Sequence, residues 1–270
     1  MRALVAARRP DLLELAIAAL GEDPFEHVTE TPANLQVAIF CASLAHLEGA
    51  GELEPQAYAG HSLGELTALV AAGSLAAEDG VALVAARGRA TDLAVAERPG
   101  GTMLAVGAGA EEAAELGRPF GLVVANDNAP TQVVLAGAAD DIADARNDFK
   151  ARGLKASRLP VPGAFHSPWM EPAVAPYTEA LERTRLRPPR APVYSCVTAA
   201  PFDDEDDMRR LLAASLTSGV RWREVLLAIG ASGIRNFVEA GPGRVLTALV
   251  PKTLPDATAH PLQELEAVGG

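Results

Sequence analysis

Ser62 occupies the centre of a pattern that is typical of nucleophilic serines. Residues 60–64 read GHSLG, which fits G-x-S-x-G, the pattern of a sharp strand-to-helix turn that exposes a serine hydroxyl. The two glycines allow the turn, and the N–H groups that open the following helix can stabilise a negatively charged oxygen. The pattern therefore predicts a serine that attacks an acyl carbonyl. The alternative reading is a helix-capping serine beside two packing glycines.

A serine nucleophile needs a general base, and the chain contains five histidines. His166 is the best candidate, because it lies in a loop, residues 161–168, that returns from a predicted inserted unit and can reach across a cleft. His46 falls in a predicted helix and His260 near the last residues. His61 neighbours Ser62 but should point elsewhere on the turn.

The elements expected around Ser62 are a short strand and several helices. A strand at residues 56–60 precedes the serine, and a helix from Ser62 to Ala72 follows it, ended by Gly73. The first helical pattern begins near Met1 with no strand before it. Further helices are expected over residues 10–20, 32–47, 78–96, 172–183 and about 206–229, and further strands at 193–197 and 236–239.

Between residues 99 and 163 the pattern changes to short strands that alternate with helices. The expected order is β-α-β-β-α-β, with a turn-rich segment, NDNAP, at residues 126–130. This order is typical of the ferredoxin-like arrangement. We therefore predict a catalytic unit made of residues 1–98 and 164–270, with a small unit of residues 99–163 inserted in it.

Composition excludes several classes of protein. The 270 residues are 49% hydrophobic and carry a formal charge of −12, which argues against broad binding to nucleic acid or to a membrane surface. The two cysteines, Cys41 and Cys196, lack metal-binding spacing and are too few for a disulfide framework, so no metal site is expected. No segment is long and apolar enough for a membrane span or a signal peptide, and the expected location is the cytoplasm.

Four ordered motifs resemble those of malonyl-CoA:acyl carrier protein transacylases and the related acyltransferase domains of fatty acid and polyketide synthases. They read GHSLGE at residues 60–65, RG at 87–88, GAFHSPWM at 163–170 and EAGPGRVL at 239–246. Residues 126–134 are also similar to that family's small-subdomain signature. The resemblance implies an α/β fold: an α/β-hydrolase-like large subdomain with an inserted ferredoxin-like small subdomain.

The resemblance also implies a reaction. Ser62, activated by His166, would take a malonyl group from malonyl-CoA as an acyl-serine ester, and the phosphopantetheine thiol of an acyl carrier protein would then attack that ester. Coenzyme A enters as part of the substrate, so no cofactor is expected. Arg87 would hold the free malonyl carboxylate, because the guanidinium fork matches a carboxylate. Without the motif, Arg87 could equally be an arginine exposed on the surface of a helix.

The remaining residues implied to line the substrate site belong to the same motifs: His61, Leu63, Phe165 and Asn128. The N–H of Leu63 would form part of the oxyanion hole. Phe165 would crowd an α-methyl branch, which predicts malonyl over methylmalonyl. Thr91 stands where the family usually has a methionine. A backbone carbonyl near residues 216–222, LTSGVRW, would orient His166, and Ser215 aligns with the family's usual glutamine.

Relatives begin with a strand and a GQGSQ segment whose first glutamine completes the oxyanion hole. This sequence has no counterpart of that segment, which predicts a misassigned start codon or a shortened chain. Loss of one oxyanion donor costs roughly 10²–10³ in rate. An intact mass beginning at Met1, measured on protein from its natural source, would refute the start-codon explanation.

The carrier protein implied by the resemblance is acidic, so its docking requires a local basic patch on this acidic chain. Candidates for this basic patch form two groups, Arg183, Arg185, Arg187 and Arg190, and Arg209, Arg210, Arg221 and Arg223.

The protein is expected to be a monomer. Two other hypotheses about its function remain open: a serine thioesterase or hydrolase on the same scaffold, and an inactive, truncated homologue that binds the carrier protein.

Overall fold

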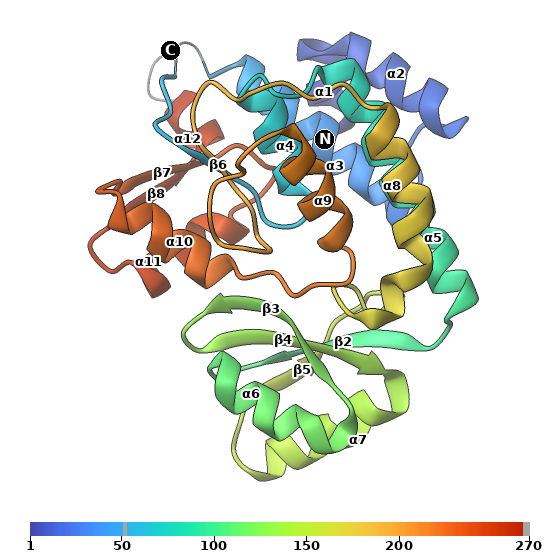
Figure 1. The fold of residues 1–270 in the computed structure, drawn as a ribbon, viewed down its shortest axis with the longest axis vertical. Coiled ribbons are helices and arrows are strands. Elements are labelled where there is room, and N and C mark those ends of the chain that lie inside the picture. The colour runs from blue at the N-terminus through green and yellow to red at the C-terminus, as the bar shows by residue number, and fades with distance from the viewer. Residues whose placement is uncertain (51–52, 267–270) are drawn as a thin grey trace.

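Two bodies of different architecture make up the chain, a larger one rich in helices and a smaller one built on a four-stranded sheet (Figure 1). The computed structural model describes residues 1–50 and 53–266. No helix in these ranges combines the length and apolar character needed to cross a membrane. The mixture of helices and strands agrees with the α/β class predicted from the sequence.

The large body begins with a group of packed helices. They are α1 (Arg2–Arg8), α2 (Pro10–Leu20), α3 (Pro32–Glu48) and α5 (Ala77–Glu97). Helix α3 starts at Pro32, where the fixed φ of proline suits the first turn, and Thr31 caps it by accepting a hydrogen bond of 3.1 Å from the Asn34 N–H. Buried side chains of α3 and α5, such as Phe40 and Val84, join the main hydrophobic core.

The strand before Ser62 is shorter than predicted. Strand β1 (Tyr58–Ala59) pairs in parallel with β6 (Val193–Tyr194), and α4 (Gly64–Ala71) follows the serine. The 3₁₀ helix η2 (Pro168–Ala173) and α8 (Val174–Arg183) follow the His166 loop. The serine turn and the histidine loop are therefore each held by a helix that begins directly after them.

The last part of the large body carries helices α9 (Glu205–Ala214) and α10 (Trp222–Ala231). A second small parallel sheet pairs β7 (Asn236–Glu239) with β8 (Thr258–Pro261). The remaining helices are α11 (Val245–Thr253) and α12 (Leu262–Glu266).

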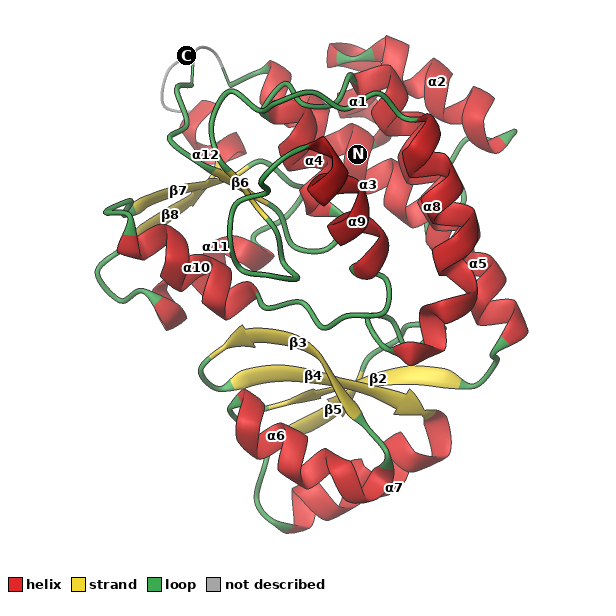
Figure 2. Cartoon of the chain, viewed as in Figure 1, coloured by secondary structure: helices red, strands yellow, loops and turns green. Residues whose placement is uncertain are grey.

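The small body has the ferredoxin-like order predicted for it. Its sheet is antiparallel with the strand order β3-β4-β2-β5, and helices α6 and α7 cover the face turned away from the large body (Figure 2). Leu104, Leu135 and Phe149 fill the space between sheet and helices. The elements are β2 (Gly101–Val106), α6 (Ala110–Gly117), η1 (Arg118–Phe120), β3 (Val123–Ala129), β4 (Gln132–Ala138), α7 (Ala139–Ala151) and β5 (Ala156–Arg158).

The turn predicted over residues 126–130 was wrong in extent. Strand β3 continues through Ala129, with irregular pairing to β4 on either side of Asn126 and Asp127. The strand persists because it is paired on both edges: the Asp127 N–H donates to the Val220 carbonyl and the Val220 N–H to the Ala125 carbonyl, both at 2.8 Å. The composition suggested a turn, but a segment of the large body supplies the missing backbone partners.

The chain crosses between the two bodies twice. The first crossing follows Glu97, and the second lies between Arg158 and Pro168, so the predicted boundaries at 98/99 and 163/164 fall within these connections. The crossings lie close together, since a Cβ at Gly101 would come within 2.8 Å of the Ala164 backbone nitrogen. His166 follows the second crossing directly and therefore lies at the junction of the two bodies.

Candidate active site

Ser62 lies at the apex of a strained turn between β1 and α4. Its φ is +54°, a left-handed conformation that is uncommon for a residue other than glycine. The turn is tight because Gly60 has no side chain: a Cβ there would lie 1.9 Å from the carbonyl carbon of Gly64. The Leu63 N–H makes no hydrogen bond within the described residues and opens the N-terminal turn of α4, so it is free to bind a developing oxyanion.

His166 lies within hydrogen-bond distance of the serine hydroxyl. The hydroxyl of Ser62 donates to Nε2 of His166 at 2.8 Å, and Nδ1 of His166 donates to the carbonyl oxygen of Ser215 at 2.8 Å. Because a carbonyl only accepts, it fixes the proton on Nδ1 and leaves Nε2 as the base. The pair can therefore move a proton from Ser62 to His166.

The Ser215 carbonyl, where the resemblance placed a backbone acceptor, is held by the end of helix α9. Ser215 is the C-terminal cap of that helix, its N–H donates to the Leu211 carbonyl at 2.8 Å, and its hydroxyl donates to the Leu212 carbonyl at 2.7 Å. At the other end, Asp204 caps the helix by accepting from the Asp207 N–H. A helix C-terminus carries partial negative charge, so it stabilises the imidazolium that forms during proton transfer.

The environment of His166 keeps its imidazole neutral. Burial, together with the smaller effect of the nearby positive charge of Arg87, lowers the pKa of His166 to about 3, whereas the hydrogen bond to the Ser215 carbonyl opposes the shift. His166 is therefore unprotonated, and able to accept the Ser62 proton, throughout the neutral range.

Arg87 is buried beside the serine, and the alternative of a surface arginine was wrong. Only 6% of Arg87 is exposed, and its Nη2 donates to Oγ of Ser62 at 3.1 Å while Nη1 donates to Oε1 of Gln36. Helices α3 and α5 approach closely at this level, because a Cβ at Gly88 would lie 2.4 Å from Cα of Ala33. This close approach brings Gln36 against the guanidinium.

No carboxylate pairs with Arg87 within the described residues. Its two hydrogen-bond acceptors, Gln36 and Ser62, are neutral. Burial lowers the pKa of Arg87, and the buried groups Tyr177 and Glu65 act in the opposite direction. A buried cation without a counterion is costly, and such a group marks a place where an anion binds.

Glu65 lies behind the serine turn and is 1% exposed. Burial raises the pKa of Glu65 to about 7, against the opposing effects of the Cys196 N–H, which donates to Oε1 at 2.8 Å, and of Arg87. Its other oxygen, Oε2, has no hydrogen-bond partner in the described part of the chain. Near neutral pH this carboxyl group is therefore only partly ionised, so it compensates the charge of Arg87 only in part.

His61 faces the small body rather than the serine hydroxyl. Its Nε2 lies 2.8 Å from Oδ1 of Asn128 on β3, and its ring packs 5.6 Å from that of Trp222 on α10. Phe165 is half-buried and packs against two hydrophobic clusters, one in each body. These contacts tie the serine turn and the histidine loop to the small body.

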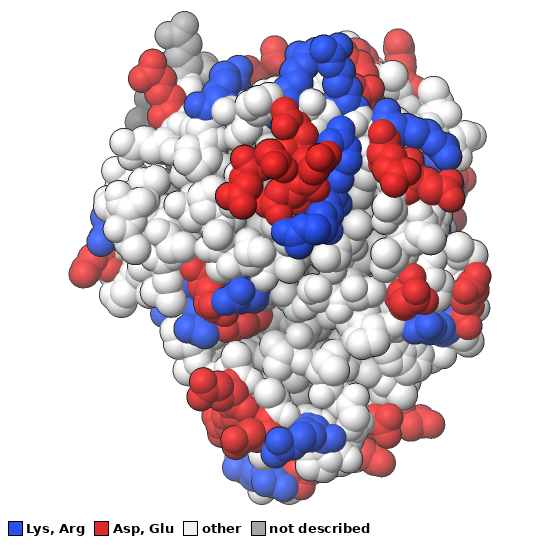
Figure 3. Space-filling model, in the orientation of Figure 1, with Lys and Arg blue, Asp and Glu red and all other residues white. Residues whose placement is uncertain are grey.

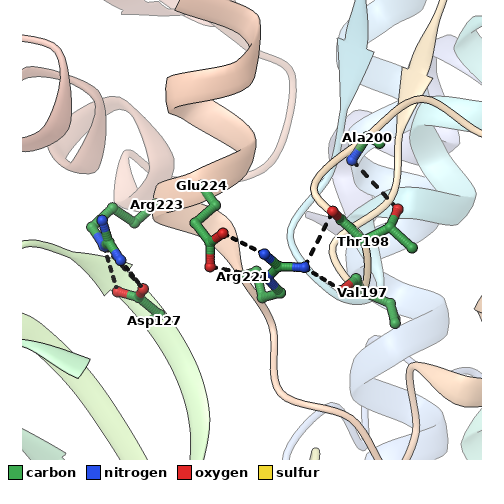
Figure 4. A network of polar contacts seen from close by, with 7 residues as sticks. All are labelled: Asp127, Val197, Thr198, Ala200, Arg221, Arg223 and Glu224. Carbon is green, nitrogen blue, oxygen red and sulfur yellow. Dashed lines mark hydrogen bonds and ion pairs between the residues drawn. The ribbon is translucent and has the colours of Figure 1, made fainter. Parts of the chain in front are cut away.

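A polar network fastens strand β3 to helix α10 next to this site (Figure 4). Arg223 pairs with the buried carboxylate of Asp127 at 2.8 Å. Arg221 pairs with Glu224 and also donates to the carbonyls of Val197 and Thr198. Of these contacts, the pair between Asp127 and Arg223 links the small body to the large one, next to Asn128 in the chain, whereas the contacts of Arg221 lie within the large body.

Three residues near Arg87 were not predicted as site residues: Gln36, Glu65 and Tyr177. Gln36 and Tyr177 belong to no motif and lie within helices whose pattern predicts ordinary packing. Glu65 belongs to the GHSLGE motif, and its position one turn after Ser62 was the available signal. Among the side chains that the structure describes, no three from His, Cys, Asp or Glu are arranged to hold a metal ion.

Five of the eight arginines proposed for docking form ion pairs with neighbouring acids. Figure 3 shows one face of the molecule, on which basic and acidic side chains are interleaved and no single continuous basic patch is seen. Arg183, Arg209, Arg210, Arg221 and Arg223 each form an ion pair with an Asp or Glu. Arg190 instead donates to the Ala71 carbonyl at the far end of α4 from Ser62.

Comparison with known proteins extends the resemblance to nearly the whole chain. The profile of the acyl transferase domain family matches residues 22–269. The polyketide biosynthesis protein ThaF of Burkholderia thailandensis is 38% identical over 94% of this chain, which spans only 23% of that protein. The malonyl CoA-acyl carrier protein transacylase of Bacillus subtilis is 36% identical over 90% of this chain and 79% of that protein.

A solved structure supports the same fold. The malonyl-transacylase in PlMCAT:AntF, a complex with a type II polyketide synthase acyl-carrier protein, matches with a TM-score of 0.88 at 30% identity. The match covers 97% of this chain and 90% of that one. The likeness therefore extends over both bodies and the junction that holds Ser62 and His166.

Proposed function

The chain belongs to the acyl transferase domain family, and from that premise we propose that it is an acyl-carrier-protein S-malonyltransferase of fatty acid or polyketide biosynthesis. It takes a malonyl group from malonyl-CoA and delivers it to the phosphopantetheine thiol of an acyl carrier protein. One chain contributes Ser62, His166 and Arg87, so a monomer suffices, and the reaction requires no cofactor.

The observation that carries this proposal is the position of Arg87. A buried cation that forms no ion pair within the described residues lies 3.1 Å from the nucleophile oxygen, where it can pair with the free carboxylate of a malonyl group whose other end reacts. An acetyl group would leave the cation unpaired. The site therefore favours an acyl group that ends in a carboxylate.

The first half-reaction transfers the malonyl group to the enzyme. His166 Nε2 accepts the proton of Ser62, and Oγ attacks the thioester carbonyl carbon. The Leu63 N–H and the start of α4 stabilise the resulting oxyanion. The carbon–sulfur bond then breaks, and the coenzyme A thiolate leaves with the proton from His166, so that a malonyl ester of Ser62 remains.

The second half-reaction reverses these steps with a different thiol. His166 accepts the proton of the phosphopantetheine thiol, and the thiolate attacks the ester carbonyl of acylated Ser62. The ester bond to Oγ breaks, and His166 returns the proton to Ser62. Carboxylate binding by Arg87 offsets the positive charge that, after burial, lowers the pKa of His166, so the base is stronger while the correct acyl group is bound.

A serine hydrolase of simple acyl chains would use the same pair of residues but has no use for Arg87. An inactive homologue would not require Ser62 and His166 to lie 2.8 Å apart.

Phe165 directly precedes the base, His166, in the chain. We propose that the ring of Phe165 disfavours a methyl branch on the α-carbon of the acyl group, so that malonyl is preferred to methylmalonyl.

Intact-mass measurement after mixing with malonyl-CoA tests the proposed function. We expect a mass increase of one malonyl group that is absent in Ser62→Ala and lost again when a phosphopantetheinylated carrier protein is added. Methylmalonyl-CoA and acetyl-CoA serve as competing donors. Absence of a malonyl ester, or its release to water at the same rate with and without the carrier protein, would rule the transferase out.

A further inference from the structure

Arg87 is held by a chain of hydrogen bonds whose direction is fixed from one end to the other. The Thr91 hydroxyl donates to the Gly88 carbonyl at 2.7 Å, so its oxygen is left to accept, and it accepts from Nε2 of Gln36 at 3.1 Å. That bond turns Oε1 of Gln36 toward Arg87, where it accepts from Nη1. The orientation of the amide is therefore set by its two partners.

The chain of bonds determines which part of the guanidinium remains for the substrate. Gln36 occupies Nη1, and the Nη2 group is directed at Oγ of Ser62 at 3.1 Å. An acyl carboxylate that pairs with Arg87 near Nη2 stays adjacent to the nucleophile. Without Gln36, the buried Nη1 would lack an acceptor and the side chain could rotate away from Ser62.

The neutrality of Gln36 matters as much as its geometry. A glutamate has the same length, and at this position it would form an ion pair with Arg87 inside the protein. The internal carboxylate would then occupy the charge that the acyl carboxylate needs. A neutral acceptor holds the guanidinium in place and leaves its charge for the substrate.

We propose that Gln36, oriented by Thr91, is a positioning residue that makes the enzyme selective for acyl groups bearing a free carboxylate. This inference rests on the proposed function and adds to it the residues that direct Arg87. Both lie on helices of the large body, α3 and α5, and neither belongs to a motif that identified the site.

The test measures acylation of Ser62 by malonyl-CoA and by acetyl-CoA in competition, read from intact mass. Gln36→Glu should lower the malonyl-to-acetyl ratio by about 100-fold, and Gln36→Leu by about ten-fold, because one hydrogen bond to a buried charge is lost. Leu35→Glu adds the same charge at a neighbouring position of α3 that is 42% exposed, and it should leave the ratio unchanged.

Thr91 provides an independent arm. Thr91→Val removes the hydroxyl that orients Gln36 and should lower the ratio about three- to ten-fold, whereas Thr91→Ser keeps the hydroxyl and should retain it. A purely structural role for Gln36 would lower acylation by both donors equally and lower the melting temperature with it. That result, or an unchanged ratio in folded Gln36→Glu, would overturn the inference.

The unsubstituted protein distinguishes this failure from failure of the proposed function. If it forms a malonyl ester and the Gln36 variants keep its selectivity, only the inference about Gln36 fails. If it forms no malonyl ester at all, the proposed function fails and the inference fails with it.

Discussion

Nη2 of Arg87 donates a hydrogen bond of 3.1 Å to Oγ of Ser62, although the two residues lie 25 positions apart in the chain. Ser62 precedes α4, and Arg87 lies in the middle of α5, where only 6% of it is exposed. The serine oxygen thus accepts from Arg87 and donates to His166. The group proposed to bind the acyl carboxylate and the group proposed to bond to the acyl carbon are therefore in direct contact.

Replacement of Arg87 should change acyl selectivity more than reactivity. We expect Arg87→Gln to lower kcat/KM with malonyl-CoA by about 10²–10³-fold, because the malonyl carboxylate loses a buried charged partner. Acylation by acetyl-CoA should change far less. The matched control is Arg89→Gln, since Arg89 lies on the same helix but faces solvent. Equal losses with both donors would contradict a carboxylate-binding role.

The two glycines of the serine turn should respond differently to alanine. Gly60→Ala should lower the free energy of unfolding by about 1–3 kcal/mol or more, because its Cβ would overlap the Gly64 carbonyl. Gly64→Ala meets no atom within 4 Å and lies in a helix, so it should be neutral or stabilising by up to about 1 kcal/mol. Denaturant unfolding of both variants measures the contrast; equal destabilisation would contradict the turn geometry.

The reactivity of Ser62 should persist at acidic pH. Burial lowers the pKa of His166 to about 3, so labelling by an uncharged sulfonyl fluoride should change little between pH 7.5 and 5. An ordinary histidine would cause a decrease of about thirty-fold over this range. In Arg87→Gln the decrease in labelling at acidic pH should begin at a higher pH, because a positive charge near His166 is removed. A decrease in labelling with a midpoint near pH 6.5 in the unsubstituted protein would refute the low pKa of His166.

Glu65 should make the protein less stable as the pH rises. Burial raises its pKa to about 7 in the folded chain from 4.5, so between these values the folded state binds more protons than the unfolded state. Its contribution to stability is complete below pH 4.5 and is lost as the pH rises through 7, an effect of about 3 kcal/mol.

Glu65→Gln removes this titration, so the difference in unfolding free energy between the two proteins isolates it. The comparison is needed because His166 acts in the opposite direction: its lowered pKa contributes stability above pH 6.5 that is lost as the pH falls toward 3. A difference that does not vary with pH from 4.5 to 7.5 would show that Glu65 titrates normally.

The ion pair between Asp127 and Arg223 should stabilise the junction of the two bodies. Arg223→Ala leaves the carboxylate of Asp127, whose side chain is 8% exposed, without its cation, and should cost about 2–4 kcal/mol. Glu224→Gln breaks the more exposed pair with Arg221 and should cost less than about 1 kcal/mol. Thermal unfolding of the two variants gives the comparison, and the reverse order would contradict it.

Much of the fold was predictable because its signals are local. The G-x-S-x-G pattern predicted that Ser62 lies in a strand-to-helix turn. The alternation of short strand and helix patterns predicted a ferredoxin-like unit between residues 99 and 163. The prediction was wrong at residues 126–130, where asparagine, aspartate and proline indicated a turn. The segment pairs with β4 and with Val220, and pairing of that kind depends on elements that are remote in sequence.

The sequence by itself determined the reactive residue types and the secondary-structure elements that carry them, because these depend on short spacing and helical or strand periodicity. Tertiary structure alone decided their partners. Periodicity predicts which side of α5 is buried but not that α3 approaches it at Gly88 closely enough to bring Gln36 against Arg87. The end of α9, 49 residues after His166, likewise supplies the carbonyl that orients the base, because packing of whole helices sets such contacts.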